Sequence, residues 1–451
     1  MSIAQRLDDL GTGRHLVRLV ARVSLGGWFE FYDLFMTAYI ALGLFRDRLF
    51  APAGGGIGAF ATFIGAGFAG MFVGTLVFGW ISDRFGRRST FGWSLLFYSI
   101  ATVAMALAPS ALSIDILRFL AGLGIGVQTI TIDAYISELV PPKTRGRYIA
   151  LSQAFSYTAV PVVALLCSLL VPAAFGGISG WRWVALFGGA GALFVRPLQR
   201  GMPESPRWLE ARGRHAEAQA AVAQLEAAAG GAAISATSDV AQRMPSGVQA
   251  GSWRQIWSGP YRGRTLTLLA FNFFQTIGFY GFASWVPVLL FAQGVTFVHS
   301  LQYTFLIALA SPLGPLVAMA LGDAAQRKWQ LVGLALGIAV LGSVFARMRD
   351  PAAIVGVGVA ITLGNNWFSC AFHAYQAELY PTAIRGRAIG FVYSFSRLSA
   401  VFVGFWIAAT LARYGIKGVF GLIAAAMAAA AAVIGIFGPI TNRRSLEALA
   451  P

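Results

Sequence analysis

Long apolar stretches separated by short polar breaks dominate the chain. Their lengths match the roughly 20 residues that an α-helix needs to cross a hydrocarbon core of about 30 Å. The pattern predicts twelve transmembrane helices, over residues 23–45, 57–81, 90–108, 112–138, 148–171, 182–199, 265–292, 299–321, 329–346, 352–378, 388–412 and 417–438.

Residues 200–263 interrupt this pattern and divide the apolar stretches six and six. They contain Pro203 and Pro206, several Arg and Glu residues, and a middle rich in Ala, Gly and Ser. Such a composition is typical of a polar loop that includes some helix. The predicted protein is an all-α membrane protein with an N-terminal six-helix bundle at 1–199, a cytoplasmic central loop at 200–263 and a C-terminal six-helix bundle at 264–451.

The two halves repeat one another when the sequence is shifted by 240 residues. This one offset aligns Asp83 with Asp323, Arg87 with Arg327, Glu138 with Glu378, Pro141 with Pro381, Arg145 with Arg385 and Arg147 with Arg387. Parallel halves related by an axis along the membrane normal are a known transporter design, with the substrate site between the halves. The alternative is a duplication that serves packing alone.

Composition excludes a water-soluble protein, because 57% of the 451 residues are hydrophobic and only 12% are charged. The net charge of +16 does not indicate nucleic-acid binding, since the basic residues are spread over alternate loops and do not gather on a polar domain. Positive loops face the cytoplasm, so we expect a multi-pass inner-membrane protein with both termini cytoplasmic. Cys167 and Cys370 lie in apolar stretches, so we expect no disulfide framework, metal cluster or cofactor.

Two carboxylates in the first span predict a proton site. Gly26, Glu30, Asp33 and Thr37 are spaced by 4, 3 and 4 residues, which places both carboxylates on one helical face and predicts that they share one cavity. A charge inside the bilayer costs at least about 2.5–3.5 kcal/mol unless it is paired or hydrated. Two neighbouring carboxylates do not both ionise cheaply, so one is expected to exchange protons near neutrality. The alternative is a structural ion pair.

Arg118 in the fourth span is predicted to contact Asp33. It lies about 9 Å into its span from the outer face, and Asp33 lies about 16 Å into the first span from the inner face. Gly122, Gly124 and Gly126 follow Arg118 and allow a neighbouring helix to approach closely.

Arg397 in the eleventh span indicates an anionic substrate. It follows Arg385 by 12 residues, or about 18 Å of helix, which places it near the middle of the membrane. A guanidinium stays charged and offers a planar fork to a carboxylate; the alternative is a fixed ion pair with Glu30 or Asp133. Asp133 and His373 occupy corresponding positions under the 240-residue shift and are candidate gate or relay residues. For His373, the alternative of a histidine that only packs against its neighbours has at least equal weight.

The loop motifs resemble the major facilitator superfamily across essentially the whole chain. The motifs are GWISDRFGRR at 79–88, which contains Asp83, Arg84 and Arg87, and E-x-x-P-x-x-x-R-G-R at 138–147 and 378–387. GWRW at 180–183 and PESPRWL at 203–209 resemble the sugar-porter, organic-ion and nicotinate-type transporters of that superfamily. The second-half counterpart PITNRRSLE departs from the family pattern at Ile440, where the family has Glu.

The resemblance and the positions of the residues together assign roles to several side chains. Asp33 and Arg118 match the proton-coupling pair of sugar porters, with Glu30 beside them, and Arg397 matches an arginine of organic-anion carriers. The seventh span lacks the paired glutamines of sugar transporters, and its candidate substrate residues are Asn272, Gln275, Phe279, Tyr280 and Trp285. The loop residues Asp83, Arg84, Arg87, Glu138, Arg145, Asp323, Glu378 and Arg385 are expected to form salt bridges that depend on the conformational state.

These observations predict a proton-coupled symporter that imports a small organic anion, an aromatic or short-chain monocarboxylate, by alternating access. We expect a monomer whose partners are a small-molecule substrate, protons and the lipid bilayer. The alternatives are a sugar or polyol symporter and an organic-cation carrier. A sensor or an intramembrane enzyme is a further class, but the sequence contains no recognisable nucleophile arrangement, metal cluster or phosphate loop.

Overall fold

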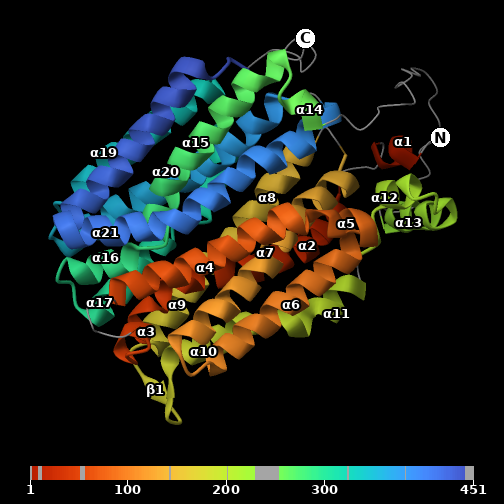
Figure 1. The fold of residues 1–451 in the computed structure, drawn as a ribbon. Helices are drawn as coiled ribbons and strands as arrows, with labels where there is room; N and C mark the ends of the chain where they lie inside the picture. Colours follow the sequence, from red (N-terminus) through yellow and green to blue (C-terminus); the bar gives the residue numbers. More distant parts are fainter. Residues whose placement is uncertain are drawn as a thin grey trace.

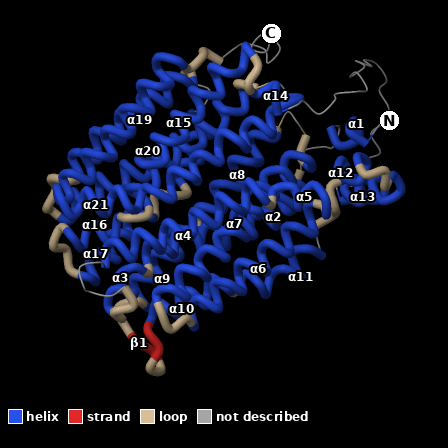
Figure 2. Tube along the Cα trace, in the orientation of Figure 1, coloured by secondary structure: helices blue, strands red, loops and turns tan. Residues whose placement is uncertain are grey.

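The computed structural model of the chain describes residues 3–8, 13–50, 56–141, 144–200, 202–228, 253–321, 325–380 and 382–441. Almost all of this part is helical, and a short hairpin of β1 (Ala174–Phe175) and β2 (Ile178–Ser179) protrudes at one end (Figure 2). The long helices form two groups, one from each half of the chain (Figure 1).

Six membrane-crossing segments form the N-terminal group, and a short helix, α5 (Gly79–Phe85), lies in the loop after the second of them. The segments are α2 (Arg14–Tyr39) continued by α3 (Ala41–Arg46), α4 (Gly56–Val77), α6 (Arg87–Leu107), α7 (Ala111–Leu139), α8 (Arg145–Tyr157) continued by α9 (Ala159–Leu170), and α10 (Gly180–Gly189) continued by α11 (Gly191–Arg200).

Six further segments form the C-terminal group. They are α15 (Gly259–Ala283) continued by α16 (Val286–Ala292), α17 (Phe297–Ala308) continued by α18 (Leu313–Leu321), α19 (Arg327–Phe345), α20 (Pro351–Glu378), and the two parts of α21 (Thr382–Phe437). The backbone of α21 leaves helical geometry at Gly415, where φ is 63° and ψ is −164°. Because L-residues with a side chain rarely adopt this positive φ, glycine at position 415 allows the chain to turn between the last two segments.

The predicted twelve-helix fold in two six-helix bundles is confirmed. Within the described residues, nine helices are long and apolar enough to cross a membrane, and one of these, from Arg387 to Phe437, contains two segments. The remaining two are α2, which carries five charged residues, and the pair α10 and α11, which are individually short.

Short helices lie outside the two bundles, at one end of the molecule. These are α1 (Ile3–Asp8), α12 (Pro206–Ala211), α13 (His215–Ala228) and α14 (Trp253–Ile256). Helix α1 packs beside α12 and α13 (Figure 1), with the side chains of Ile3 and Leu7 buried. Arg6 on α1 forms an ion pair of 2.6 Å with Glu226 on α13, so the start of the chain is joined to the segment between the bundles.

The two bundles pack against each other through small and aromatic residues. A Cβ atom on Gly404 of α21 would lie 3.2 Å from Cα of Ala61 on α4, so the absence of a side chain lets these helices approach closely. Near the β hairpin end, Phe60 of α4 contacts Trp285 at the start of α16, with ring centroids 4.8 Å apart. These contacts leave the space for a binding site deeper between the bundles.

Candidate functional site

A cavity lies between the two bundles. Helices α2, α7 and α8 line it from the N-terminal bundle, and α15, α20 and α21 line it from the C-terminal bundle. We call it the central cavity. The structure brings seven of the sequence-predicted residues together in its lining, namely Glu30, Asp133, Gln275, Phe279, Tyr280, His373 and Arg397.

Arg397 is the one arginine among the residues that line the central cavity. Its side chain is 4% exposed, and its Nη1 donates a hydrogen bond of 2.6 Å to Oη of Tyr280. The guanidinium carbon also lies 5.0 Å from the ring centroid of Tyr393. Arg397 forms no ion pair with any described residue, so the predicted alternative of a fixed pair with Glu30 or Asp133 is not present in this structure. Its charge is therefore available to an anion in the cavity.

Glu30 and Asp33 do not share one cavity, which corrects the prediction from their spacing. Glu30 lines the central cavity and accepts a hydrogen bond from Oγ1 of Thr129. Asp33 is outside that lining, fully buried, and its Oδ2 accepts a hydrogen bond of 2.7 Å from Thr102 of α6. Residues three apart on a helix are rotated by about 60° relative to each other, and this rotation is enough to separate the two carboxylates.

Arg118 forms the predicted contact with Asp33, and the two side chains make a buried ion pair. Gly122 and Gly126, which follow Arg118, pack against α4 and not against α2, the helix that contains Asp33. A Cβ on Gly122 would lie 2.1 Å from the carbonyl oxygen of Gly67, and one on Gly126 would lie 2.4 Å from that of Met71. Both carbonyls belong to α4, so the glycines allow α7 to pack closely on α4 and thereby hold Arg118 in the bundle interior.

Asn272 and Trp285 lie outside the lining of the central cavity, unlike the other candidates of the seventh span. Nδ2 of Asn272 donates a hydrogen bond of 2.9 Å to Oε1 of Gln376, which joins α15 to α20. Trp285 follows the end of α15 at Ala283, so helical spacing no longer predicts its direction, and its ring packs on Phe60. Both residues stabilise contacts between helices in this structure.

Sequence reasoning missed several uncharged residues of the cavity wall. Gln153 and Tyr157 of α8 both line it, and Tyr157 contacts Phe31 with ring centroids 4.7 Å apart. Sγ of Cys370 donates a hydrogen bond of 3.3 Å to Oε1 of Gln153, across the two bundles. Outside the seventh span, no motif or spacing in the sequence distinguishes one aromatic or amide residue from another, so only the fold identifies these positions.

Asp133 and His373, which correspond in the two halves, face the same cavity. Asp133 is exposed to solvent, so the cavity is open beside it. His373 donates from Nδ1 to the carbonyl oxygen of Ser369 over 2.7 Å and stacks on Phe372 at 4.2 Å between ring centroids. His373 is therefore held in one orientation, and its role as gate or relay remains a prediction.

The loop motifs form matching ion pairs in the two halves. Arg87 binds Asp83 at 2.6 Å and Glu138 at 2.9 Å, and Arg327 forms an ion pair with Glu378 at the corresponding place. Arg84 instead lies over the rings of Trp80 and Phe85. Asp323 lies outside the described residues, as do the side chains of Arg145 and Arg385.

The PESPRWL segment docks on the loop that contains Asp83 and Arg87. Oε1 of Glu204 accepts hydrogen bonds from the backbone N–H groups of Arg87 at 2.8 Å and Arg88 at 3.1 Å. A carboxylate at this place stabilises the N-terminus of α6, where unpaired N–H groups and the positive end of the helix dipole lie. Nε1 of Trp208 donates to the carbonyl oxygen of Asp83 over 2.7 Å, so the segment between the bundles is attached to this loop.

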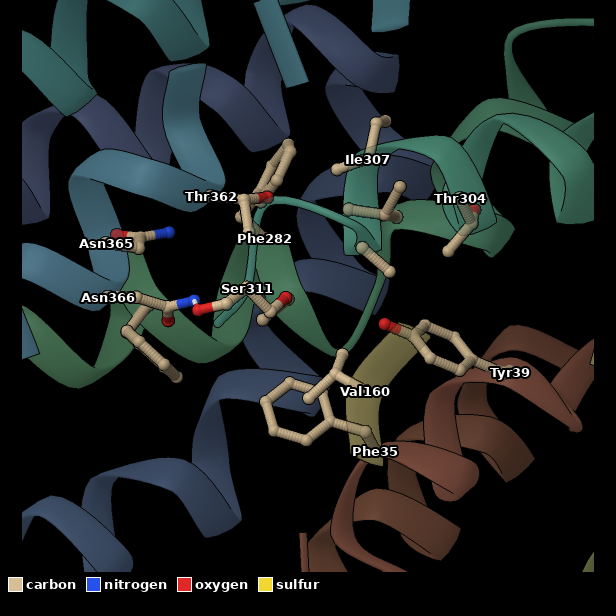
Figure 3. A pocket seen from close by; sticks show the side chains of 14 residues that line it. Phe35, Tyr39, Val160, Phe282, Thr304, Ile307, Ser311, Thr362, Asn365 and Asn366 are labelled. Carbon is tan, nitrogen blue, oxygen red and sulfur yellow. Dashed lines mark hydrogen bonds between the residues drawn. The ribbon is translucent and has the colours of Figure 1, made fainter. Parts of the chain in front are cut away.

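A second, smaller hollow adjoins the central cavity. Figure 3 shows Asn365 and Asn366 on one wall, with Phe35 and Tyr39 across from them. We call it the neutral chamber, because the described residues that line it include no charged side chain. Phe35 and Phe279 line both hollows, so the two spaces meet at these rings.

Comparison with known proteins gives matches over essentially the whole chain. The model of the sugar (and other) transporter family matches residues 20–451. A niacin transporter of Acinetobacter baylyi is 31% identical over 452 residues, covering 100% of both chains. A putative metabolite transport protein of Bacillus subtilis is 30% identical over 456 residues, covering 98% of this chain and 96% of that protein.

The solved structures include the xylose transporter of Escherichia coli in a partially occluded, inward-open conformation. It matches with a TM-score of 0.78 over 96% of this chain and 100% of that chain, at 18% identity, and this likeness concerns the fold. The family match, the relatives and the helical architecture agree that the protein is a multi-pass membrane transporter and not an enzyme. The chain belongs to the sugar (and other) transporter family, within the major facilitator superfamily.

Proposed function

We propose that the protein is a proton-coupled symporter that imports a small organic anion, an aromatic or short-chain monocarboxylate. The observation that carries this proposal is Arg397, a buried cation in the central cavity that has no ion-pair partner among the described residues. An arginine in this setting binds a carboxylate through two parallel hydrogen bonds. The niacin transporter adds support, because niacin is itself an aromatic monocarboxylic acid.

The aromatic residues around Arg397 favour an aromatic substrate. Tyr280 and Tyr393 flank the guanidinium, and Phe31, Tyr157 and Phe372 line the same space. Aromatic rings attract one another in offset or edge-to-face arrangements worth about 0.5–1.5 kcal/mol beyond the area they bury. A substrate that joins a carboxylate to a ring satisfies both parts of this wall.

Protons enter the proposal through Glu30, Asp33 and Arg118. Glu30 lines the central cavity, where a proton and the substrate arrive together. The charge of Asp33, outside the cavity lining, is balanced by its ion pair with Arg118. Moving one negative charge inward against an inside-negative potential costs about 2.3 kcal/mol per 100 mV. A co-transported proton offsets that cost, so we assign Glu30 and Asp33 as the carboxylates that exchange protons, and Arg118 as the partner from which Asp33 separates when it is protonated.

Alternating access follows from rocking of the bundles 1–199 and 264–451, with 200–263 as the connection between them. The contact of Phe60 with Trp285 closes one end of the cavity, and Asp133 is exposed toward the other. We propose that the open end and both termini face the cytoplasm across the inner membrane. The Arg87 and Arg327 ion pairs then lie on the cytoplasmic side, where they stabilise particular states of the cycle.

A sugar or polyol symporter is the second candidate, and the neutral chamber is the observation in its favour. Asn365, Asn366, Ser311 and Thr304 offer amide and hydroxyl groups there without a charge. Uptake into proteoliposomes separates the two candidates. We expect a pH gradient, acid outside, to drive accumulation of labelled nicotinate and not of xylose, with nicotinamide as the uncharged control. Accumulation of xylose without nicotinate would replace the anion proposal with the sugar one.

A further inference from the structure

The central cavity and the neutral chamber lie one beyond the other along the same helices. On α2, Phe31 lines the cavity, Phe35 lines both spaces and Tyr39 lines the chamber. On α20, Ser369 lines the cavity and Asn365 lines the chamber. Each of these steps is four residues, which keeps the same helical face and advances about 6 Å along the axis. The two spaces therefore lie in line along the helices and meet at the side chains of Phe35 and Phe279, which line both.

The junction between the two spaces has aromatic walls. Phe35 comes from the N-terminal bundle and Phe279 from the C-terminal bundle. Phe279 also contacts Tyr280 at 5.0 Å between ring centroids, and Tyr280 accepts the hydrogen bond from Arg397. A flat aromatic ring suits this junction, because both of its faces would meet other rings or apolar side chains.

The two spaces differ in chemistry. Arg397 supplies a positive charge at the cavity end, whereas the described lining of the chamber end has no charged side chain. Asn365 is 3% exposed, and its Oδ1 accepts no hydrogen bond from any described residue. The neighbouring Asn366 is already engaged, since its Nδ2 donates to the carbonyl oxygen of Ser311 over 3.0 Å. Buried polar atoms are almost always paired, so Oδ1 of Asn365 is suited to a donor on a ligand.

We propose that the substrate is an aromatic carboxylate with an uncharged hydrogen-bond donor at the far end of its ring, and that Asn365 recognises this donor. The carboxylate binds Arg397, the ring lies between Phe35 and Phe279, and the donor reaches Oδ1 of Asn365 in the neutral chamber. The inference rests on the proposed function, because it places the anionic end of the ligand at Arg397. It adds a specificity residue and a requirement at the opposite end of the substrate.

Calorimetric titration of the purified full-length protein with three probes tests the proposal. The probes are benzoate, 4-hydroxybenzoate, which carries a donor, and 4-methoxybenzoate, which carries only an acceptor. We expect the hydroxyl group to tighten binding by about tenfold over benzoate, the value of one good hydrogen bond, and the methoxy group to give no such gain. In Asn365→Leu the affinity for benzoate should stay within about twofold, and the gain from the hydroxyl group should disappear.

Two control variants show whether the effect belongs to Asn365 and to the chamber. Gln153→Met removes an amide from the central cavity but not from the chamber, so it should preserve the ratio between 4-hydroxybenzoate and benzoate. Ala308→Leu adds volume to the chamber without touching Asn365, so it should weaken both 4-substituted probes and spare benzoate; it also serves if Asn365→Leu does not fold.

A tenfold gain from the hydroxyl group that persists in Asn365→Leu, or an equal gain from the methoxy group, would overturn the proposal. Failure of the proposed function is a separate outcome. It would show as benzoate affinity that does not change in Arg397→Ala, whatever the 4-substituted probes do.

Discussion

Arg118 and Asp33 form an ion pair in which the side chains are 1% and 0% exposed. Removing one partner from a buried pair leaves an uncompensated charge in a poorly hydrated interior, which typically costs about 3–5 kcal/mol. The pair therefore contributes to the stability of the N-terminal bundle only while both members are present. Any step of the cycle that changes the charge of Asp33 also changes the packing of α2 against α7.

Asp33→Asn should abolish accumulation driven by a pH gradient and retain counterflow exchange. Exchange requires substrate binding and rocking of the bundles but no net proton movement, whereas accumulation requires a carboxylate that gains and loses a proton. Both rates are measured in proteoliposomes with the same labelled substrate. Full accumulation in Asp33→Asn would remove Asp33 from the coupling set.

Arg118→Ala should lower the free energy of unfolding by about 3–5 kcal/mol, because it leaves the carboxylate of Asp33 buried without its partner.

Glu30→Gln tests the carboxylate that faces the cavity. We expect it to lose pH-driven accumulation as well, but to unfold close to the wild-type temperature, because the amide oxygen of Gln can still accept the hydrogen bond from Thr129. The comparison with Asp33→Asn is made by thermal unfolding and uptake on the same preparations. If Glu30→Gln accumulates substrate normally while Asp33→Asn does not, proton exchange occurs at the buried pair alone.

Arg87→Ala should slow the transport cycle more than Asp83→Asn, because Arg87 holds both Asp83 and Glu138. The affinity for substrate should stay within a few fold, since this loop lies away from the central cavity. Arg84→Ala is the matched control, because Arg84 lies beside the same cluster over aromatic rings and should have the smaller effect. Exchange rates and equilibrium binding are measured in parallel, and a variant with a defect in binding alone would contradict a role in the conformational cycle.

The ion pair between Arg6 and Glu226 predicts a pH-dependent attachment of α1. The hydrogen bond from Arg6 holds the pKa of Glu226 below its usual value. A carboxyl group with a lowered folded-state pKa contributes stability above its unfolded pKa of about 4.3 and loses it as pH falls through the folded value. Amide-exchange protection of residues 3–8 should therefore fall below about pH 4. The factor should be under about fivefold, because the pair is partly exposed. Glu226→Gln should show the low protection at every pH.

The spacing of charges and glycines predicted much of the N-terminal site. Arg118 meets Asp33 as expected, because depth in the membrane follows directly from residue count. The direction in which each side chain points is harder to predict. The rotation between Glu30 and Asp33 sends one to the cavity and the other to Arg118, and only the packed positions of α6 and α7 decide which.

Uncharged site residues outside the seventh span were the least predictable from the sequence. Gln153 and Asn365 resemble any other polar residue in an apolar span. Their role depends on helices distant in the sequence, which place Gln153 in the wall of the central cavity and Asn365 in that of the neutral chamber. Trp285 shows the opposite case. In the sequence it has helical spacing from the cavity residues of the seventh span. Because α15 ends at Ala283, this spacing does not hold in the structure, and the ring packs on Phe60.

Substitution of Arg397 decides the substrate class. Arg397→Lys keeps the charge but loses the planar fork and the geometry of the hydrogen bond to Tyr280, whereas Arg397→Ala loses both. For a carboxylate substrate, the Lys variant should retain weakened uptake. The Ala variant should cost on the order of 2–5 kcal/mol in binding, because it leaves the substrate anion unpaired in a poorly hydrated cavity.

Binding of nicotinate and of the uncharged amide nicotinamide, measured on both Arg397 variants and the wild type, separates charge recognition from packing. The amide should bind the wild type weakly and be nearly indifferent to Arg397→Ala, since the contact that is lost is with the anion. Equal losses for the acid and the amide would mean that Arg397 supports the cavity wall through Tyr280 and Tyr393 and does not bind the substrate's charge. In that case the neutral chamber would become the primary site, and the sugar or polyol function would take the place of the anion symporter.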